Sequence, residues 1–389
     1  MKCMFQSTIC VLLLGLAVLP AHAAFKSLYV FGDSLSSTTD NPDVGSLYYG
    51  QRYSNGRVWV EVLAQRQGLT YDATKNNSYW NHTSTQMVAD TKSFTAPADV
   101  ANDLFIVWVC NADTFDAATT GTPLTPTQWQ ATNLLSQANH LQIITNLYAR
   151  GVRTLILPNA VDLSEIPAFN AGTLAPAIHA GCVNYNSQFS NTIKQARALC
   201  PGLTIYTPDF CTLLNNVLTN AANYGLTNAF VNGHTIDALD ASYRAPKIFP
   251  VAVTNGYGTN FIFWDPQDPT AQFHEVIADV VQQIISPVQI GQITAFNGSN
   301  RLDVVNYPAG LGGFVENTTN LTQTSWTALQ NITSTNTTPS FFVLTPAATN
   351  TTSPIVPAYS GGLPEPGGAV VVTALDFYRL HFPFAWNWP

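Results

Sequence analysis

The stretch SLYVFGDSLSS, residues 27–37, places a Gly-Asp-Ser turn directly after a short apolar run. Such a run is typical of a buried strand. A serine that follows a buried strand either caps the next helical turn or stands rigidly at the strand's end, where a nucleophile can act. The rest of the chain has to decide between these two roles for Ser34.

Apolar runs alternate with helical patterns from Phe25 to about residue 286. Strands are predicted at 103–109, 153–158 and 203–206 as well as in the opening stretch. Helices are predicted at about 56–65, 129–151, 182–200 and 269–285. This alternation predicts a parallel sheet with helices on both faces. Any chemistry is then expected beyond the carboxyl ends of the strands.

The pattern changes after Pro287. From there to residue 389, apolar positions alternate with Thr and Asn between Gly, Pro and Asn turns, and no helical period is present. This pattern predicts a small all-β module, sandwich-like in form. The chain therefore divides into an α/β domain at 25–286 and a β-rich accessory domain at 287–389.

The first 23 residues are typical of a signal peptide. Lys2 precedes the run ICVLLLGLAVL, which starts at Ile9 and is too short to span a bilayer. Small residues follow in PAHAAF, and we expect cleavage after Ala23. The mature protein is thus expected to be secreted or periplasmic. No later run reaches about 18 apolar residues, so no transmembrane segment is expected.

Charged residues make up only 10% of the chain, and the net charge is −8. Such a chain has no basic stripe with which to neutralise phosphates, so a nucleic-acid partner is excluded. No Cys/His cluster has zinc spacing, so no metal site is predicted. Neither composition nor periodicity indicates an oligomeric state.

Four cysteines remain after the signal peptide: Cys110, Cys182, Cys200 and Cys211. Cys182 and Cys200 bracket one predicted helix, whose eighteen residues span about 27 Å. That span far exceeds the roughly 4.4–6.8 Å between bridged α-carbons. A Cys200–Cys211 disulfide is therefore the preferred prediction in an exported protein.

Four sequence blocks occur in a family-specific order: FGDSLSSTTDNP, RYSNGRVWVEVLA, LPNAVDLSEIPAF and FIFWDPQDPTAQFHEVIAD. With them the chain resembles the GDSL lipase/esterase family, also called SGNH hydrolases, over residues 25–286. Its exported bacterial lysophospholipase-like and lecithinase/haemolysin-like branch is the most similar. The resemblance implies a serine esterase on a flavodoxin-like, three-layer α/β fold. It implies no cofactor, and a small-molecule or lipid ester as substrate, with lysophospholipids among the candidates.

The resemblance assigns roles to individual residues. Ser34 matches the nucleophile, and Asp265 matches the acid that orients the catalytic base. Asn111, in the segment VCNAD, matches the side-chain donor of the oxyanion hole. Asn81 stands where the family has a glycine whose N–H completes that hole. Asn tolerates the left-handed region better than most residues, so the N–H can still serve there.

The expected histidine base is missing. The family's Asp-x-x-His-Pro-Thr block reads Asp-Pro-Gln-Asp-Pro-Thr here, with Asp268 in the histidine position. His274, which adjoins Asp265, is the first candidate for the base, and His82, in the loop that borders the nucleophile, is the second. The pair of Asp265 and Asp268 is the third, because like-charge repulsion can raise one pKa. Alternatively, Asp268 is only the N-cap of the following helix.

Two functions follow from these observations. The preferred hypothesis is an exported serine esterase that hydrolyses acyl esters. The alternative is a catalytically weak scaffold of the same fold that binds a lipid or a glycan, since both the histidine and the glycine of the family pattern are replaced.

Overall fold

The computed structural model describes residues 25–42, 47–120, 122, 124–240, 257–297, 299–318, 325–333, 340–346 and 377–382. The predicted signal peptide, residues 1–23, lies outside these ranges.

A five-stranded parallel sheet forms the centre of the α/β part, in the order β2-β1-β3-β4-β5. Its strands are β1 (Leu28–Gly32), β2 (Asn76–Ser78), β3 (Leu104–Trp108), β4 (Thr154–Ile156) and β5 (Thr204–Tyr206). All five residues of the central strand β3 are buried, as expected for a strand covered on both faces. The predicted α/β fold is confirmed.

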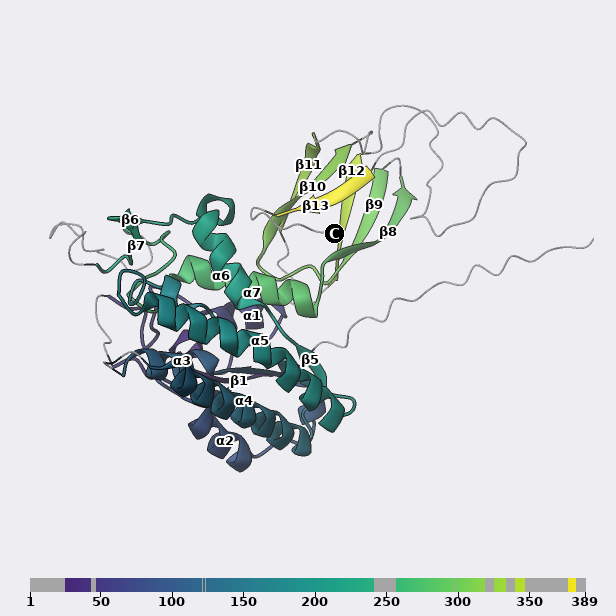
Figure 1. Ribbon diagram of the computed structural model, residues 1–389. Helices are drawn as coiled ribbons and strands as arrows, with labels where there is room; N and C mark the ends of the chain where they lie inside the picture. The colour runs from purple at the N-terminus through teal and green to yellow at the C-terminus, as the bar shows by residue number, and fades with distance from the viewer. Residues whose placement is uncertain are drawn as a thin grey trace, which may run out of the picture.

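Seven α-helices are described around this sheet. They are α1 (Trp59–Arg66), α2 (Ser84–Ser93), α3 (Cys110–Ala118), α4 (Pro126–Ala149), α5 (Ala175–Leu199), α6 (Phe210–Thr219) and α7 (Ala271–Ile285). Helix α1 packs against α7, while α4 packs against both α2 and α5. Figure 1 shows α1 and α7 above the strands and α2 and α4 below them. No helix in the described part of the chain is long and apolar enough to cross a membrane.

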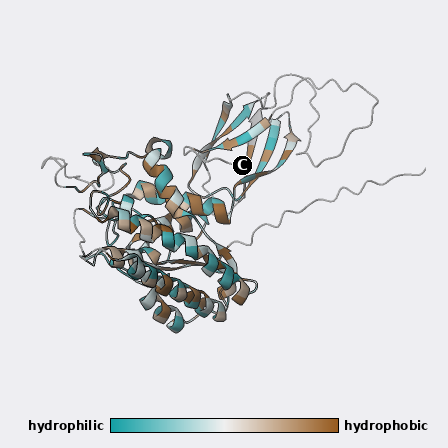
Figure 2. Cartoon of the chain, viewed as in Figure 1, coloured by the Kyte–Doolittle hydropathy of each residue, from teal (hydrophilic) through white to brown (hydrophobic). Residues whose placement is uncertain are grey.

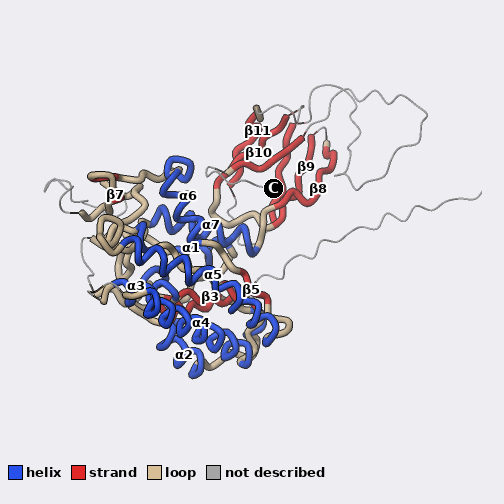
Figure 3. The backbone as a smooth tube through the Cα atoms, in the orientation of Figure 1, coloured by secondary structure: helices blue, strands red, loops and turns tan. Residues whose placement is uncertain are grey.

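The strands that follow α7 form two three-stranded antiparallel sheets, in the orders β12-β9-β8 and β11-β10-β13. They are β8 (Gln289–Phe296), β9 (Ser299–Val305), β10 (Gly312–Thr318), β11 (Thr327–Thr333), β12 (Ser340–Pro346) and β13 (Phe377–His381). Figure 3 shows them as an all-strand body beside the helices, and Figure 2 shows hydrophilic and hydrophobic residues interleaved along the strands. Buried residues such as Leu302, Val315 and Phe382 form a core of their own. The predicted all-β region is thus present.

The predicted Cys200–Cys211 disulfide was wrong. Both cysteines are free thiols, as are Cys110 and Cys182. Cys200 follows the end of α5, whereas Cys211 lies in the first turn of α6. Strand β5 runs between them and carries the chain from the amino ends of the parallel strands towards their carboxyl ends. Closeness along the sequence therefore does not bring these two sulfur atoms together.

Candidate active site

Ser34 stands directly beyond the carboxyl end of β1. It opens a single 3-10 turn, Ser34–Ser36, which Asp33 caps by accepting a hydrogen bond from the N–H of Leu35 at 3.1 Å. Gly32 is required just before this turn, because an added Cβ would lie 2.7 Å from that of Ser36 and 2.9 Å from the Ser78 hydroxyl. The Gly-Asp-Ser sequence thus builds a tight turn that presents Ser34.

The Ser34 hydroxyl donates a hydrogen bond to Oδ1 of Asp268 at 3.0 Å. Asp268 is only 1% exposed, and its Oδ2 has no hydrogen-bond partner among the described residues. The N-cap of α7 is Thr270 rather than Asp268, which corrects the alternative interpretation of Asp268. The residue in the family's histidine position therefore contacts the serine directly, but it is a carboxyl group.

Asp265 lies beside Asp268 and fixes its backbone. Oδ1 of Asp265 accepts hydrogen bonds from the N–H groups of Gln267 at 2.9 Å and Asp268 at 2.8 Å, and Oδ2 accepts one from the Tyr48 hydroxyl at 3.0 Å. The structure thus brings Asp265 to the site, as the sequence predicts, but its partners are backbone amides and a tyrosine. The sequence argument gave no role to Tyr48, which lies far from Asp265 along the chain.

Burial raises the pKa of both carboxyls. For Asp268 the shift is large, because the charge of Asp265 adds to complete burial and outweighs the hydrogen bond from Ser34. Asp265 is better stabilised as an anion by its three donors. Of the two, Asp268 therefore keeps its proton to the higher pH.

His274 is not placed to act as the base, which corrects the first candidate. It is 1% exposed in the first turn of α7, and neither of its ring nitrogens has a hydrogen-bond partner among the described residues. Burial lowers its pKa to about 3, so the ring is neutral. The backbone N–H of His274 donates to the carbonyl of Thr270 at the start of the helix. His274 is close to Asp265 in the sequence because α7 begins soon after Asp265, and its side chain is buried as part of that helix.

His82 is also held away from the Ser34 hydroxyl. Its Nδ1 lies 3.0 Å from the carbonyl oxygen of Gly32, its Nε2 lies 2.8 Å from Asp90, and its ring stacks on Tyr79. The ring is fully buried, and burial lowers its pKa despite the Asp90 charge. His82 therefore ties the end of β1 to α2, which is a structural role.

Asn111 and Asn81 are the two residues that the sequence suggests for the oxyanion hole. The Oδ1 atom of Asn111 accepts a hydrogen bond from the N–H of Val161 at 3.0 Å, which orients the side chain. Its Nδ2 is buried without a partner among the described residues. Asn81 has a φ of 54°, the left-handed conformation of the glycine that it replaces. Both residues line the same cavity as Ser34.

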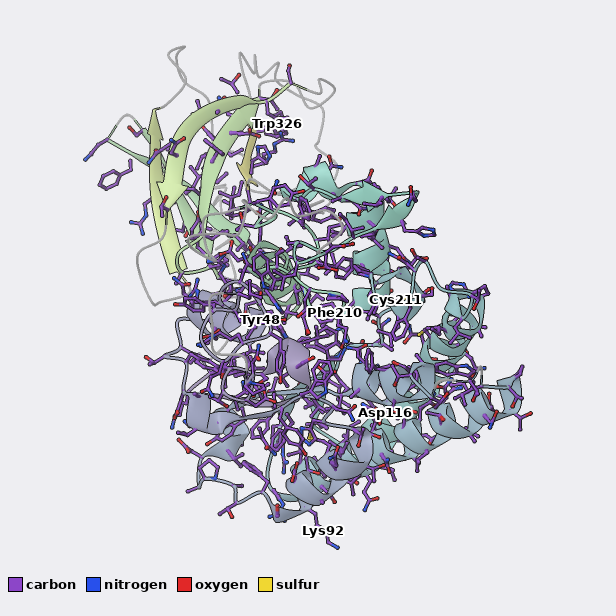
Figure 4. All side chains as sticks on the ribbon, turned by 90° about the vertical axis from the view of Figure 1, so that its left-hand side faces the viewer. Tyr48, Lys92, Asp116, Phe210, Cys211 and Trp326 are labelled. Carbon is purple, nitrogen blue, oxygen red and sulfur yellow. The ribbon has the colours of Figure 1, made fainter. Side chains whose placement is uncertain are left out.

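The cavity has an empty volume of about 760 Å³, counting its open mouth. Its walls are mainly apolar and come from several helices and loops. The apolar lining residues include Leu163, Ile166, Phe210, Leu213, Leu214, Phe273 and Ile277. Figure 4 labels Phe210, at the start of α6, and Tyr48, near the site's carboxyls. Ser34, Asn111 and Asp268 supply polar atoms at this apolar cavity.

No group of three His, Cys, Asp or Glu side chains within the described ranges is arranged to hold a metal ion. The atoms at the site are instead a hydroxyl, a paired carboxyl and an unpartnered amide. Together they can attack a carbonyl carbon, take up a proton and donate a hydrogen bond to an oxyanion.

The comparison with protein families decides the relationship. Residues 28–281 match the family described as GDSL-like lipase/acylhydrolase. The chain belongs to this family. It is a carboxylic ester hydrolase of the GDSL type.

One relative and two solved structures illustrate its neighbours. A GDSL esterase/lipase of Arabidopsis thaliana is 22% identical over 330 residues, which cover 68% of this chain and 87% of the relative. An acetylxylan esterase from Geobacillus stearothermophilus is 12% identical, with a TM-score of 0.38, over 68% of this chain and 94% of its own. An α/β hydrolase from the metagenome of Lake Arreo, Spain, is 13% identical with a TM-score of 0.37, and the match covers 67% of this chain and 95% of that hydrolase.

Proposed function

We propose that the protein is an exported serine esterase in which Ser34 is the nucleophile and Asp268 is the general base. The observation that carries this proposal is the 3.0 Å hydrogen bond from the Ser34 hydroxyl to Asp268. The contact lies at the cavity into which Asn111 presents an unpartnered amide. Nucleophile, base and oxyanion donor are thus grouped without a histidine.

In the proposed reaction, Oγ of Ser34 attacks the ester carbonyl carbon while its proton passes to Oδ1 of Asp268. The Asn111 amide and the N–H groups of Ser34 and Asn81 stabilise the resulting oxyanion. Asp268 then returns the proton to the leaving alcohol oxygen, which leaves an acyl group on Ser34. Water then attacks this acyl group while its proton passes to Asp268, and Asp268 returns the proton to Oγ of Ser34 as the Oγ–acyl bond breaks and the free acid leaves.

A carboxylate is ordinarily too weak a base for this task. Burial and the neighbouring charge of Asp265 raise the pKa of Asp268 and so make its ionised form more basic. Asp265, held by three hydrogen-bond donors, acts as a positioning residue because it fixes the backbone of Asp268. The pair thus replaces the histidine-aspartate pair that the family resemblance implies.

The apolar part of the cavity is the proposed site for the acyl chain. Leu213, Leu214 and Ile277 offer surface that an aliphatic chain can cover, and each buried methylene contributes about 0.8 kcal/mol. Acyl esters, lysophospholipids among them, are the proposed substrates. The leader-like residues 1–23 support the proposed export.

Hydrolysis of p-nitrophenyl butyrate by the purified protein and three variants tests this function. Ser34→Ala should abolish turnover, and Asp268→Asn should reduce kcat/KM by about 10²–10⁴-fold, the usual contribution of a general base. Asp268→His should remain active at neutral pH, because imidazole supplies the base found in the family's motif. Turnover that survives Ser34→Ala would contradict the nucleophile. A wild-type protein without activity would favour the lipid- or glycan-binding scaffold.

A further inference from the structure

The alcohol part of the substrate must lie near Asp268, because Asp268 returns the proton to the leaving oxygen. Trp80 lines the same cavity as Asp268, and Tyr53 and Asp40 contact Trp80. The Tyr53 and Trp80 rings are 5.4 Å apart between centroids, and Trp80 lines the cavity mouth with 40% of its surface exposed. The alcohol is therefore expected to meet two aromatic rings.

The Asp40 carboxylate is bonded to both Trp80 and Tyr53. Oδ2 of Asp40 accepts hydrogen bonds from the backbone N–H of Trp80 at 2.6 Å and from the Tyr53 hydroxyl at 3.4 Å. Ser37 donates to its other oxygen. Burial, followed by the charges of Asp40, Asp268 and Asp265, raises the pKa of the Tyr53 hydroxyl. Tyr53 thus lies within the electrostatic range of three acidic groups.

No positive side chain offsets these acidic groups at the described cavity lining. The ionisable residues of this lining, Asp33 and Asp268, are both acidic, and burial raises the pKa of both, so the carboxylate next to the two rings is that of Asp40. Arg52, the cation next to Tyr53 in the chain, is paired with Glu61 at 2.6 Å and lies over the Tyr49 ring. The buried Oδ2 of Asp268 also has no partner among the described residues. A negative, aromatic environment of this kind attracts cations and repels phosphate groups.

We infer that the preferred substrates are esters whose alcohol part carries an ammonium group, held by the Tyr53 and Trp80 rings and by Asp40. This inference rests on the proposed esterase function, since it assigns the alcohol side from the position of the base. Aromatic faces and a carboxylate are the groups that recognise quaternary ammonium ligands in proteins. Among lysophospholipids, those with a choline head group fit this environment better than acidic ones.

The test compares butyrylcholine with 3,3-dimethylbutyl butyrate, its uncharged carbon isostere. The wild-type kcat/KM should favour butyrylcholine by about tenfold, within the range of a partly desolvated cation–π contact. Calorimetric titration of the Ser34→Ala variant with the two esters measures the same preference without turnover. The choline ester should bind that variant more tightly.

Two variants assign the preference to this environment. Asp40→Asn removes the charge; its one oxygen can still accept from the Trp80 N–H and the Tyr53 hydroxyl, while its NH2 group can donate to the Ser37 hydroxyl. It should lower the butyrylcholine-to-isostere ratio to about twofold. Trp80→Leu should lower it as well, and its exposed position tolerates the change. Asp72→Asn is the matched control. Asp72 is exposed and accepts a hydrogen bond from the N–H of Thr74, and its replacement should leave the butyrylcholine-to-isostere ratio unchanged.

Failure of the ammonium inference can be distinguished from failure of the proposed esterase function. Equal or better turnover of the isostere, or equal binding to Ser34→Ala, would overturn the inference while leaving the esterase in place. Hydrolysis of neither ester, nor of p-nitrophenyl butyrate, would overturn the esterase, and the calorimetric comparison would still decide whether ammonium is recognised. If neither Asp40→Asn nor Trp80→Leu lowers the butyrylcholine-to-isostere ratio, the ammonium group binds at another position.

Discussion

At the residue scale, the proposed role of Asp268 as the general base makes the activation of Ser34 depend on pH. Asp268 acts as a base only when it is ionised, and burial and Asp265 raise its pKa well above the usual range. We therefore expect the pH–rate profile for p-nitrophenyl butyrate to have an ascending limb, along which kcat/KM rises with pH. The midpoint of this limb should lie above the usual pKa range of a carboxyl group. Asp265→Asn removes a repelling charge, which lowers the pKa of Asp268, so this limb should move to lower pH.

A pH–rate profile of the wild type and Asp265→Asn, measured from pH 4 to 9, checks this prediction. Tyr48→Phe is the matched control: it removes one donor to Asp265 but leaves the charge, so it should move the limb far less. A limb that stays in place in Asp265→Asn, or moves to higher pH, would contradict the proposed coupling.

The sequence named three of the residues that the structure brings to this candidate site but not the contact between Ser34 and Asp268. Ser34, Asn111 and Asp265 follow strand ends or recognisable blocks, so position alone located them. The direct contact between Ser34 and Asp268 depends on how two segments 234 positions apart meet, which no local pattern encodes. The closeness of His274 to Asp265 in the sequence suggested it as the catalytic base. Whether its ring faces the site or the core depends on how α7 packs, which the sequence does not show.

At the element scale, the start of α7 places Asp268. Thr270 caps this helix by accepting from the N–H of Phe273 at 3.3 Å, and its hydroxyl donates to the carbonyl of Phe261 at 2.6 Å. Thr270→Ala should lower the free energy of unfolding by about 1–3 kcal/mol, since it removes the cap and leaves a buried carbonyl unpaired. Urea unfolding followed by circular dichroism measures this change.

Thr270→Ser keeps the hydroxyl and serves as the control, with a much smaller loss of stability. Equal stability of Thr270→Ala and the wild type would show that this cap does not hold the segment 265–270 in place.

The elements that were predicted have strong local signals. The apolar runs of β3 and β4 and the periodic faces of α5 and α7 are largely buried, as expected, whereas Leu134 and Leu135 of α4 are exposed. Strand β2, with the sequence Asn76-Asn77-Ser78, was not predicted, because three polar residues carry no strand signal. It forms by pairing with β1 at the edge of the sheet, which is a tertiary effect.

At the scale of the whole molecule, Arg66 joins the α/β part to the all-β region. Its Nε lies 2.6 Å from Oδ1 of Asp279, and its Nη1 donates to the carbonyl of Ala309 at 3.3 Å. The two charged side chains are 6% and 1% exposed. Arg66→Met should destabilise the protein by about 3–5 kcal/mol, because it leaves the Asp279 charge buried and unpaired.

Burial raises the pKa of Asp279 even with Arg66 present, so the pair itself adds little net stability. The double variant Arg66→Met/Asp279→Leu should therefore recover most of the loss in denaturant unfolding. Lys26→Met, which breaks the exposed pair with Asp99, is the control and should change stability little. A double variant as unstable as Arg66→Met would contradict this argument.

Labelling by a fluorophosphonate probe tests the central claim, that Asp268 activates Ser34. Peptide mass spectrometry should find the probe on Ser34 of the wild type and of His274→Gln at similar rates, and not on Ser34→Ala. Asp268→Asn should be labelled about 100-fold more slowly or less, since the general base is lost. Labelling of Asp268→Asn at the wild-type rate, or no labelling of the wild type, would contradict the claim.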